Sequence, residues 1–167
     1  VFLELTAADQ ERTMLSLAVS PDGKWFASGD STGMVRVWSL AERKEVIAKK
    51  LGPTGIQYLA ISPDAQEIAT ISYDNEVTTW SVDALEQKNQ FEIVDTNSLN
   101  RIEYAAPHML AAAGNTTSLW DTSTGQLVRA LSPGRYSFAL ARSPDGTQFI
   151  HGGDDSLHLW NVADSKE

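Results

Sequence analysis

The chain has 167 residues, of which 42% are hydrophobic, and this is enough apolar material for one folded core. Its formal net charge of −9 at pH 7 creates a surface that repels phosphate backbones, so we expect no nonspecific nucleic-acid binding. The absence of cysteine excludes disulfides, thiolate catalysis and cysteine-ligated zinc or iron–sulfur centres.

No segment predicts a membrane span or a secretory leader. No apolar run reaches the roughly 20 residues of a membrane-spanning helix, and the N-terminus lacks the basic, apolar and small-residue order of a signal peptide. We therefore expect a cytoplasmic protein. The chain begins at Val1 rather than at a methionine, so we also expect a trimmed or processed chain, or a piece of a longer protein.

Short apolar runs separated by tight polar turns predict antiparallel strands along the whole chain. The turn SPDG stands at 20–23 and 143–146, and SPDA stands at 62–65. Proline presets φ at the second turn position, and aspartate followed by glycine suits the reversal. Each of these turns joins two strands, and a second polar turn leads into a third strand. A more variable fourth strand is predicted three times: KEVIAKK at 44–50, NQFEIV at 89–94 and QLVRALS at 126–132.

Tryptophan ends the third strand of each unit at a nearly constant interval. Trp38, Trp80, Trp120 and Trp160 are separated by 42, 40 and 40 residues. A period of about 40 residues with one tryptophan strand per repeat indicates the four-stranded blades of a β-propeller. The same periodicity assigns these four side chains to packing within and between blades rather than to ligand stacking.

With these features the chain resembles the WD-repeat β-propeller family over residues 14–161. Blade one, LAVSPDGKWFASGDSTGMVRVWSL, and blade four, ALARSPDGTQFIHGGDDSLHLWNV, carry the resemblance most closely. The Trp-Asp dipeptide itself occurs once, at Trp120-Asp121. The resemblance implies an all-β fold of four WD-type repeats, each of four antiparallel strands, and a non-enzymatic role as a protein-interaction scaffold.

The repeats predict one propeller module with blade 1 at about 14–50, blade 2 at about 56–94, blade 3 at about 99–131 and blade 4 at about 136–162. Few residues follow Trp160, so we expect blade 4 to be completed by the strand VFLEL at 1–5 or by another chain. Blade 3 lacks the SPDG turn, and we expect a shorter turn and looser packing there.

The number of blades leaves three arrangements open, because the resemblance implies a ring of more than four. The chain is a fragment of a larger propeller, a half-ring that dimerises into an eight-bladed ring, or a closed four-bladed unit. We favour the first two. An open arc exposes two apolar blade faces, which soluble monomers avoid.

The resemblance also implies a buried polar network of histidine, turn aspartate, serine or threonine, and tryptophan in each blade. Asp74 and Asp154 stand six residues before their tryptophans, where the family's aspartate stands. Ser28 and Thr70 match the serine or threonine position. The Gly-His dipeptide that supplies the histidine is absent from all four repeats, so we expect a partial network and greater dependence on apolar packing.

No motif predicts catalysis, since the chain lacks the nucleophile elbow, the phosphate-binding loop and the dinucleotide fingerprint. His151 and His158 flank a turn that contains Asp154 and Asp155, which makes a metal site conceivable. Spacing places no third ligand, and a polar hairpin is the simpler interpretation. We expect no cofactor, no metal ion and no enzyme activity from this chain.

The resemblance places partner contacts on the loops at one end of the propeller. These are the segments 6–13, 50–55, 94–101 and 131–136 and the turns 30–33, 73–75 and 152–155. Arginine and tyrosine are favoured interface anchors, which selects Arg101, Arg135, Tyr136 and Tyr73 as contact candidates.

We therefore expect one or more protein partners, and neither nucleic acid nor a membrane. A homodimer or association with further propeller blades is also compatible with the pattern. The alternative function is that of an assembly piece whose blade edges complete a larger ring. A less favoured alternative is that the chain belongs to an enzyme whose catalytic domain lies elsewhere.

Overall fold

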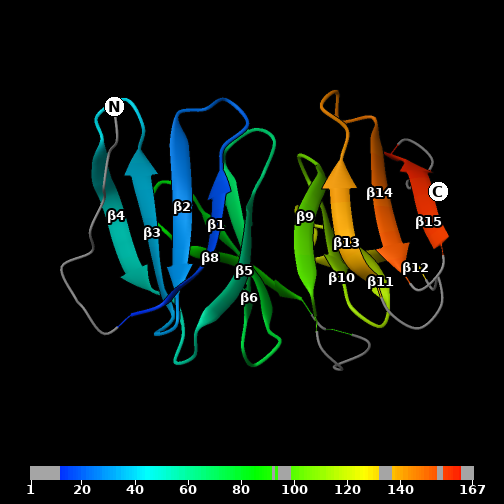
Figure 1. The fold of residues 1–167 in the computed structure, drawn as a ribbon, viewed down its shortest axis with the longest axis horizontal. Helices are drawn as coiled ribbons and strands as arrows, with labels where there is room; N and C mark the ends of the chain where they lie inside the picture. The colour runs from blue at the N-terminus through cyan, green and yellow to red at the C-terminus, as the bar shows by residue number, and fades with distance from the viewer. Residues whose placement is uncertain (1–11, 92, 94–98, 132–136, 154–155, 163–167) are drawn as a thin grey trace.

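Short strands and tight turns build an all-β molecule, as the sequence predicts. The computed structural model describes residues 12–91, 93, 99–131, 137–153 and 156–162 (Figure 1). Blade 1 consists of β1 (Met14–Val19), β2 (Trp25–Asp30), β3 (Met34–Ser39) and β4 (Lys44–Lys50). Blade 2 consists of β5 (Ile56–Ile61), β6 (Glu67–Ser72), β7 (Val77–Ser81) and β8 (Gln87–Phe91).

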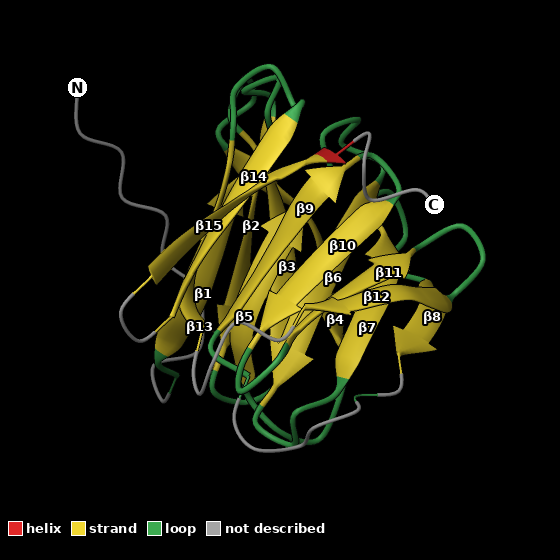
Figure 2. Ribbon diagram, turned by 90° about the vertical axis from the view of Figure 1, so that its right-hand side faces the viewer, coloured by secondary structure: helices red, strands yellow, loops and turns green. Residues whose placement is uncertain are grey.

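The second half of the chain repeats the same antiparallel order. Blade 3 consists of β9 (Arg101–Ala106), β10 (Met109–Ala113), β11 (Thr117–Asp121) and β12 (Gln126–Leu131). Blade 4 has three described strands, β13 (Ser137–Arg142), β14 (Gln148–Gly153) and β15 (Ser156–Asn161). The predicted completing strand at 1–5 lies outside the described residues. The all-β propeller prediction is confirmed, and the described part contains no helix long and apolar enough to cross a membrane (Figure 2).

The SPDG turns form because their own side chains satisfy the reversed backbone. In the first of them the Ser20 hydroxyl donates to Asp22 Oδ1 at 2.6 Å, and the Lys24 backbone N–H donates to the same oxygen at 3.1 Å. These bonds lower the pKa of Asp22 to about 2, with the Ser20 hydroxyl as the largest cause. Gly23 takes a positive φ of 68° at no steric cost, whereas Ala65 takes 57° at the same place in SPDA.

The face of a blade that carries its tryptophan is here called the tryptophan face, and the opposite face is called the reverse face. Blades 2, 3 and 4 each pack their tryptophan face against the reverse face of the preceding blade. Val37 of blade 1 and Trp80 of blade 2 share one buried cluster. Trp120 lies in the cluster between blades 2 and 3. Leu119 of blade 3 lies in a third cluster, against which Trp160 of blade 4 packs. Trp80, Trp120 and Trp160 are thus inter-blade packing residues, whereas Trp38 stacks on Phe26 within its own blade.

The four blades form an open arc. The innermost strands β1, β5, β9 and β13 pack in chain order, each against the next. Figure 1 shows the outer strands of blade 1 and of blade 4 at opposite ends of the molecule. Among the described residues, β13 and β1 have no comparable packing against each other. In the part of the chain that the structure describes, one face of blade 1 and one face of blade 4 therefore have no neighbouring blade.

The expectation of loose packing in blade 3 is wrong. Its β9–β10 turn is short, as predicted, but every residue from Met109 to Ala113 is at most 3% exposed. Blade 3 has a neighbour on both faces, so its central strand is enclosed whatever the turn beside it. The small side chains of Ala111 and Ala112 allow the adjacent blades to approach closely.

Candidate functional site: the loop rim and the channel

The loops at one end of the arc form a connected rim. The backbone of Gly33, in the turn 30–33 of blade 1, lies directly against the carbonyl oxygens of Gly52 and Thr54 in the loop that enters blade 2. Farther along, the Leu99 backbone N–H donates to Asn75 Oδ1 at 3.3 Å, which joins the turn of blade 2 to the loop that enters blade 3. Successive blades thus hold their rim loops in fixed register.

Two of the four predicted contact residues lie in the described rim. Tyr73 is 52% exposed, and its ring covers Gly55. Arg101 is exposed at the start of β9, where its guanidinium lies 5.8 Å from the centroid of the Tyr58 ring. Arg135 and Tyr136 lie outside the described residues. Tyr73 belongs to blade 2 and Arg101 to blade 3, which are adjacent blades. The two residues place an aromatic ring and a positive charge on neighbouring parts of the rim.

In blades 1 and 2 the tryptophan forms a hydrogen bond with the serine or threonine that the family resemblance selects. Trp38 Nε1 donates to Ser28 Oγ at 3.1 Å, and Trp80 Nε1 donates to Thr70 Oγ1 at 2.9 Å. All four residues are at most 8% exposed. In blade 3 the strand register puts Ala112 at the hydroxyl position, so Trp120 has no such acceptor there. The hydroxyl therefore fixes the indole orientation in two blades and not in the third.

The aspartates differ from the family-based expectation. Asp74 is exposed and its Oδ2 accepts a hydrogen bond from Thr54 Oγ1 at 2.8 Å, so it caps a rim loop and does not join the buried pair in its blade. Asp154 lies outside the described residues. Spacing relative to the tryptophan misses a buried carboxylate in the turn 30–33, that of Asp30, which is 1% exposed.

Asp30 organises the first rim turn. It accepts hydrogen bonds from the backbone N–H and hydroxyl of Thr32 at 2.8 and 2.7 Å and from the Met34 N–H at 3.1 Å. Burial opposes ionisation of this carboxyl, but the bonds from Thr32 and Met34 and the nearby Arg12 outweigh burial and lower its pKa. The Asp-Ser-Thr-Gly order of this turn, a typical self-capping sequence, is the signal that identifies Asp30.

In blade 4 the strand register places His151 at the position that Ser28 and Thr70 occupy in blades 1 and 2. His151 pairs with His158 across β14 and β15 and is 0% exposed. Its ring stacks on His158 at 5.0 Å and on Trp160 at 6.0 Å between centroids. Within the described residues, neither ring nitrogen of His151 has a hydrogen-bond partner, nor does Trp160 Nε1. No group of three potential metal ligands occurs in the described part of the chain.

We expect blade 4 to lose stability in mild acid. Burial, and then the neighbouring His158, lower the pKa of His151 below its ordinary 6.5. The unfolded chain therefore binds a proton that the folded chain resists, so the free energy of unfolding falls as the pH drops below about 6.5. Urea unfolding at about pH 7.5 and about pH 5.5 measures this loss. His151→Ser, which restores a hydroxyl acceptor, should reduce the loss, and an unchanged loss in this variant would contradict the assignment.

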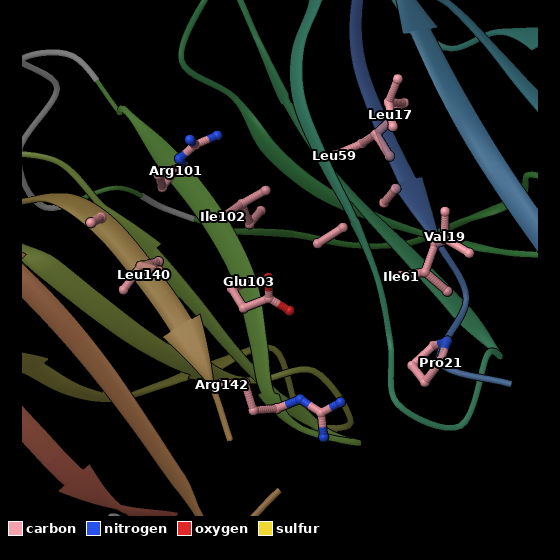
Figure 3. Close-up of a pocket in the computed structure, with 13 residues that line it drawn as sticks. Leu17, Val19, Pro21, Leu59, Ile61, Arg101, Ile102, Glu103, Leu140 and Arg142 are labelled. Atoms are coloured by element: carbon pink, nitrogen blue, oxygen red, sulfur yellow. The ribbon is translucent and has the colours of Figure 1, made fainter. Parts of the chain in front are cut away.

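The innermost strands of all four blades line a channel cavity of about 540 Å³ (Figure 3). Most of the residues that line it are aliphatic, and Arg101, Glu103 and Arg142 are the charged residues among them. Figure 3 shows Arg101 near one end, Arg142 near the other and Glu103 between them. Burial raises the pKa of Glu103, and the positive charge of Arg142 opposes that rise.

Comparison with known proteins supports this architecture. Residues 5–39 match the family described as WD domain, G-beta repeat. The pre-rRNA-processing protein crb3/ipi3 of Schizosaccharomyces pombe is 23% identical over 166 residues, which cover 88% of this chain and 37% of that protein. The chain thus spans well under half of that relative.

Solved structures share the fold at low sequence identity. The β-propeller domain of Cps50 (Swd1) from Myceliophteria thermophila superposes with a TM-score of 0.76 at 16% identity, covering 91% of this chain and 55% of the other. A chain of the mitotic checkpoint complex superposes with a TM-score of 0.80 at 17% identity, covering 95% of this chain and 50% of the other. Its tryptophan period, its blades and the match at residues 5–39 make this chain a β-propeller built of WD-type repeats.

Proposed function

We propose that this chain is a non-catalytic scaffold that binds a protein partner through its loop rim. The connected rim is the observation that supports the proposal. Because Gly33 packs on the next loop and Asn75 bonds Leu99, the loops lose little conformational entropy when a partner binds. Rigid strands that present variable loops are a common basis for recognition. Related propellers that occur in multiprotein assemblies, such as the mitotic checkpoint complex, are consistent with this role.

The proposed contact residues are Tyr73 and Arg101, together with Arg135 and Tyr136. Tyrosine and arginine bury large surfaces on binding and supply directed hydrogen bonds. Tyr73 is half-exposed on the rim, and the Arg101 guanidinium is already held over the Tyr58 ring. The net charge of −9 favours a partner with a basic surface, because complementary charge accelerates association.

Partner capture tests this function. The intact chain serves as bait, and captured proteins are quantified for the wild type, for Tyr73→Ala/Arg101→Ala and for Arg135→Ala/Tyr136→Ala. We expect both double variants to lose at least about tenfold in capture, with an unchanged melting temperature. Lys24→Ala/Leu40→Ala, at the opposite end of the blades, is the matched control. Equal capture by the rim variants and the control would overturn the rim as the contact surface.

A further inference from the structure

One tryptophan stands outside the 40-residue period and lines a groove between blades 1 and 2. Trp25 begins β2, which runs from this groove to the rim turn 30–33, so the groove lies at the end of the blades opposite the rim. The groove has a volume of about 320 Å³, and the Trp25 side chain is only partly buried. Val46 on β4, which is 49% exposed, and Val82 after β7 form aliphatic walls. A cavity of this size is small for a ligand site and suits a single long side chain.

The corresponding corner is filled where blade 2 meets blade 3 and where blade 3 meets blade 4. The strand register places Glu67 and Met109 at the position of Trp25, beside the residue that follows each blade's tryptophan. Glu67 is 2% exposed, because it forms an ion pair with Lys88 and accepts a hydrogen bond from the Tyr104 hydroxyl of blade 3 at 3.2 Å. Met109 is 3% exposed and lies in the third cluster. The side chain at this position is thus buried in blades 2 and 3 and partly open in blade 1.

The groove lies inside the arc, away from both open blade faces. Its walls come from the reverse face of blade 1 and from blade 2, which pack against each other in one cluster. The open faces in the described part of the chain are the tryptophan face of blade 1 and the reverse face of blade 4. A blade added to the arc would pack on one of those faces, so the groove is formed by this chain alone.

The chemistry of the groove complements a side chain that is apolar along its length and positive at its end. Asp83 is the charged residue among those that line the groove, and it is exposed. Lys49, which reaches from β4 to blade 2, donates to the Leu85 carbonyl oxygen at 2.9 Å and does not line the groove. An indole ring attracts a cation over its face, and aliphatic walls cover an apolar stem. The aromatic ring, the valines and the carboxylate therefore match the parts of an arginine side chain.

We propose that this groove binds one arginine side chain of a partner protein. The stem of the arginine lies between Val46 and Val82, and its guanidinium stacks on Trp25 and pairs with Asp83. Arginine is preferred to lysine because a planar, weakly hydrated cation stacks on an indole ring while its N–H groups still bind a carboxylate. The site is separate from the rim proposed above and adds a second anchoring point at the opposite end of the blades.

A peptide with one arginine tests the site. The peptide acetyl-Ala-Arg-Ala-amide is titrated into the ¹⁵N-labelled chain, and we expect saturable NMR shifts of the Trp25 indole N–H and the Asp83 amide. The same peptide with citrulline, which has nearly the same shape but no charge, should bind at least about tenfold more weakly. Equal binding of the two peptides, shifts confined to the rim or the channel, or no saturable shift would each overturn the proposal.

Two groove variants and two matched controls test the residues. Asp83→Asn removes the carboxylate, and Val46→Arg places the chain's own arginine at the groove. Both positions are exposed, so each variant should fold, and each should weaken binding of the arginine peptide at least about tenfold. Glu76→Gln removes a charge at the rim end of blade 2, and Leu127→Arg adds one at a position of blade 3 that is 43% exposed. Both controls should bind normally, and normal binding by the two groove variants would overturn the assignment.

The rim variant separates this inference from the proposed function. Tyr73→Ala/Arg101→Ala should bind the arginine peptide as the wild type does, and loss of peptide binding in this variant would overturn the groove as the site. Reduced partner capture with normal peptide binding would support both proposals. Normal partner capture with normal peptide binding would overturn the rim alone, whereas rim-dependent capture by a chain that binds no arginine peptide would overturn the groove alone.

Discussion

Replacing Trp120 with alanine is expected to lower the free energy of unfolding by about 3–5 kcal/mol. The side chain is 1% exposed, and its ring lies 5.5 Å from that of Phe91 at an interplanar angle of 47°. Phe91 belongs to blade 2, so the substitution opens a cavity at the interface between blades 2 and 3. Urea denaturation followed by circular dichroism gives the change in the free energy of unfolding.

The matched control is Leu127→Ala in the neighbouring outer strand. Leu127 is 43% exposed, so its loss removes little buried surface and should cost less than about 1 kcal/mol. A similar small cost for Trp120→Ala would contradict its role as the main packing residue between these two blades. Because Trp120 has no hydroxyl acceptor at Ala112, its contribution is expected to come from packing rather than from a hydrogen bond.

The second large effect is expected from Gly33→Ala, which should cost about 2–4 kcal/mol. Gly33 has a φ of 85°, a conformation that disfavours any side chain. A Cβ there would also lie 2.4 Å from the carbonyl oxygen of Gly52 and 2.6 Å from that of Thr54. The methyl group must therefore displace the loop that joins blade 1 to blade 2.

Gly23→Ala separates the two contributions to this cost. Gly23 has a similar φ of 68°, but no atom lies within 4 Å of the position that an alanine methyl group would take. This substitution should cost only about 1 kcal/mol, which is the strain of the backbone conformation alone. Equal losses for the two variants in urea denaturation would mean that the contact between the rim loops contributes nothing. A larger loss for Gly33→Ala, with reduced partner capture, would connect rim packing to binding.

Several elements of this protein follow from local sequence. The SPDG turns form because Ser20 and Asp22 satisfy the turn backbone themselves, and this chemistry needs no distant residue. Strand alternation and the tryptophan period then define the blades, because one blade is a contiguous stretch of chain. The pairing of Trp80 with Thr70 is also accessible from the sequence, since both residues lie within one blade.

Features that depend on a neighbouring blade cannot be predicted from the local sequence. Asp74 has the expected spacing but lies in solvent, whereas Asp30, two residues outside that spacing, is buried. The close packing of blade 3 does not follow from its own turn, because its enclosure depends on blades 2 and 4.

The sequence by itself determined the repeat, the turns and the all-β blades, since each depends on interactions among residues close together in the chain. Only the tertiary structure decided which blade faces are covered. Leu119 and Leu159 occupy the same position before their tryptophans, yet one is 0% and the other 62% exposed. The physical reason is that burial of a blade face depends on a neighbouring sheet, and no local pattern in the strand records whether that neighbour is present.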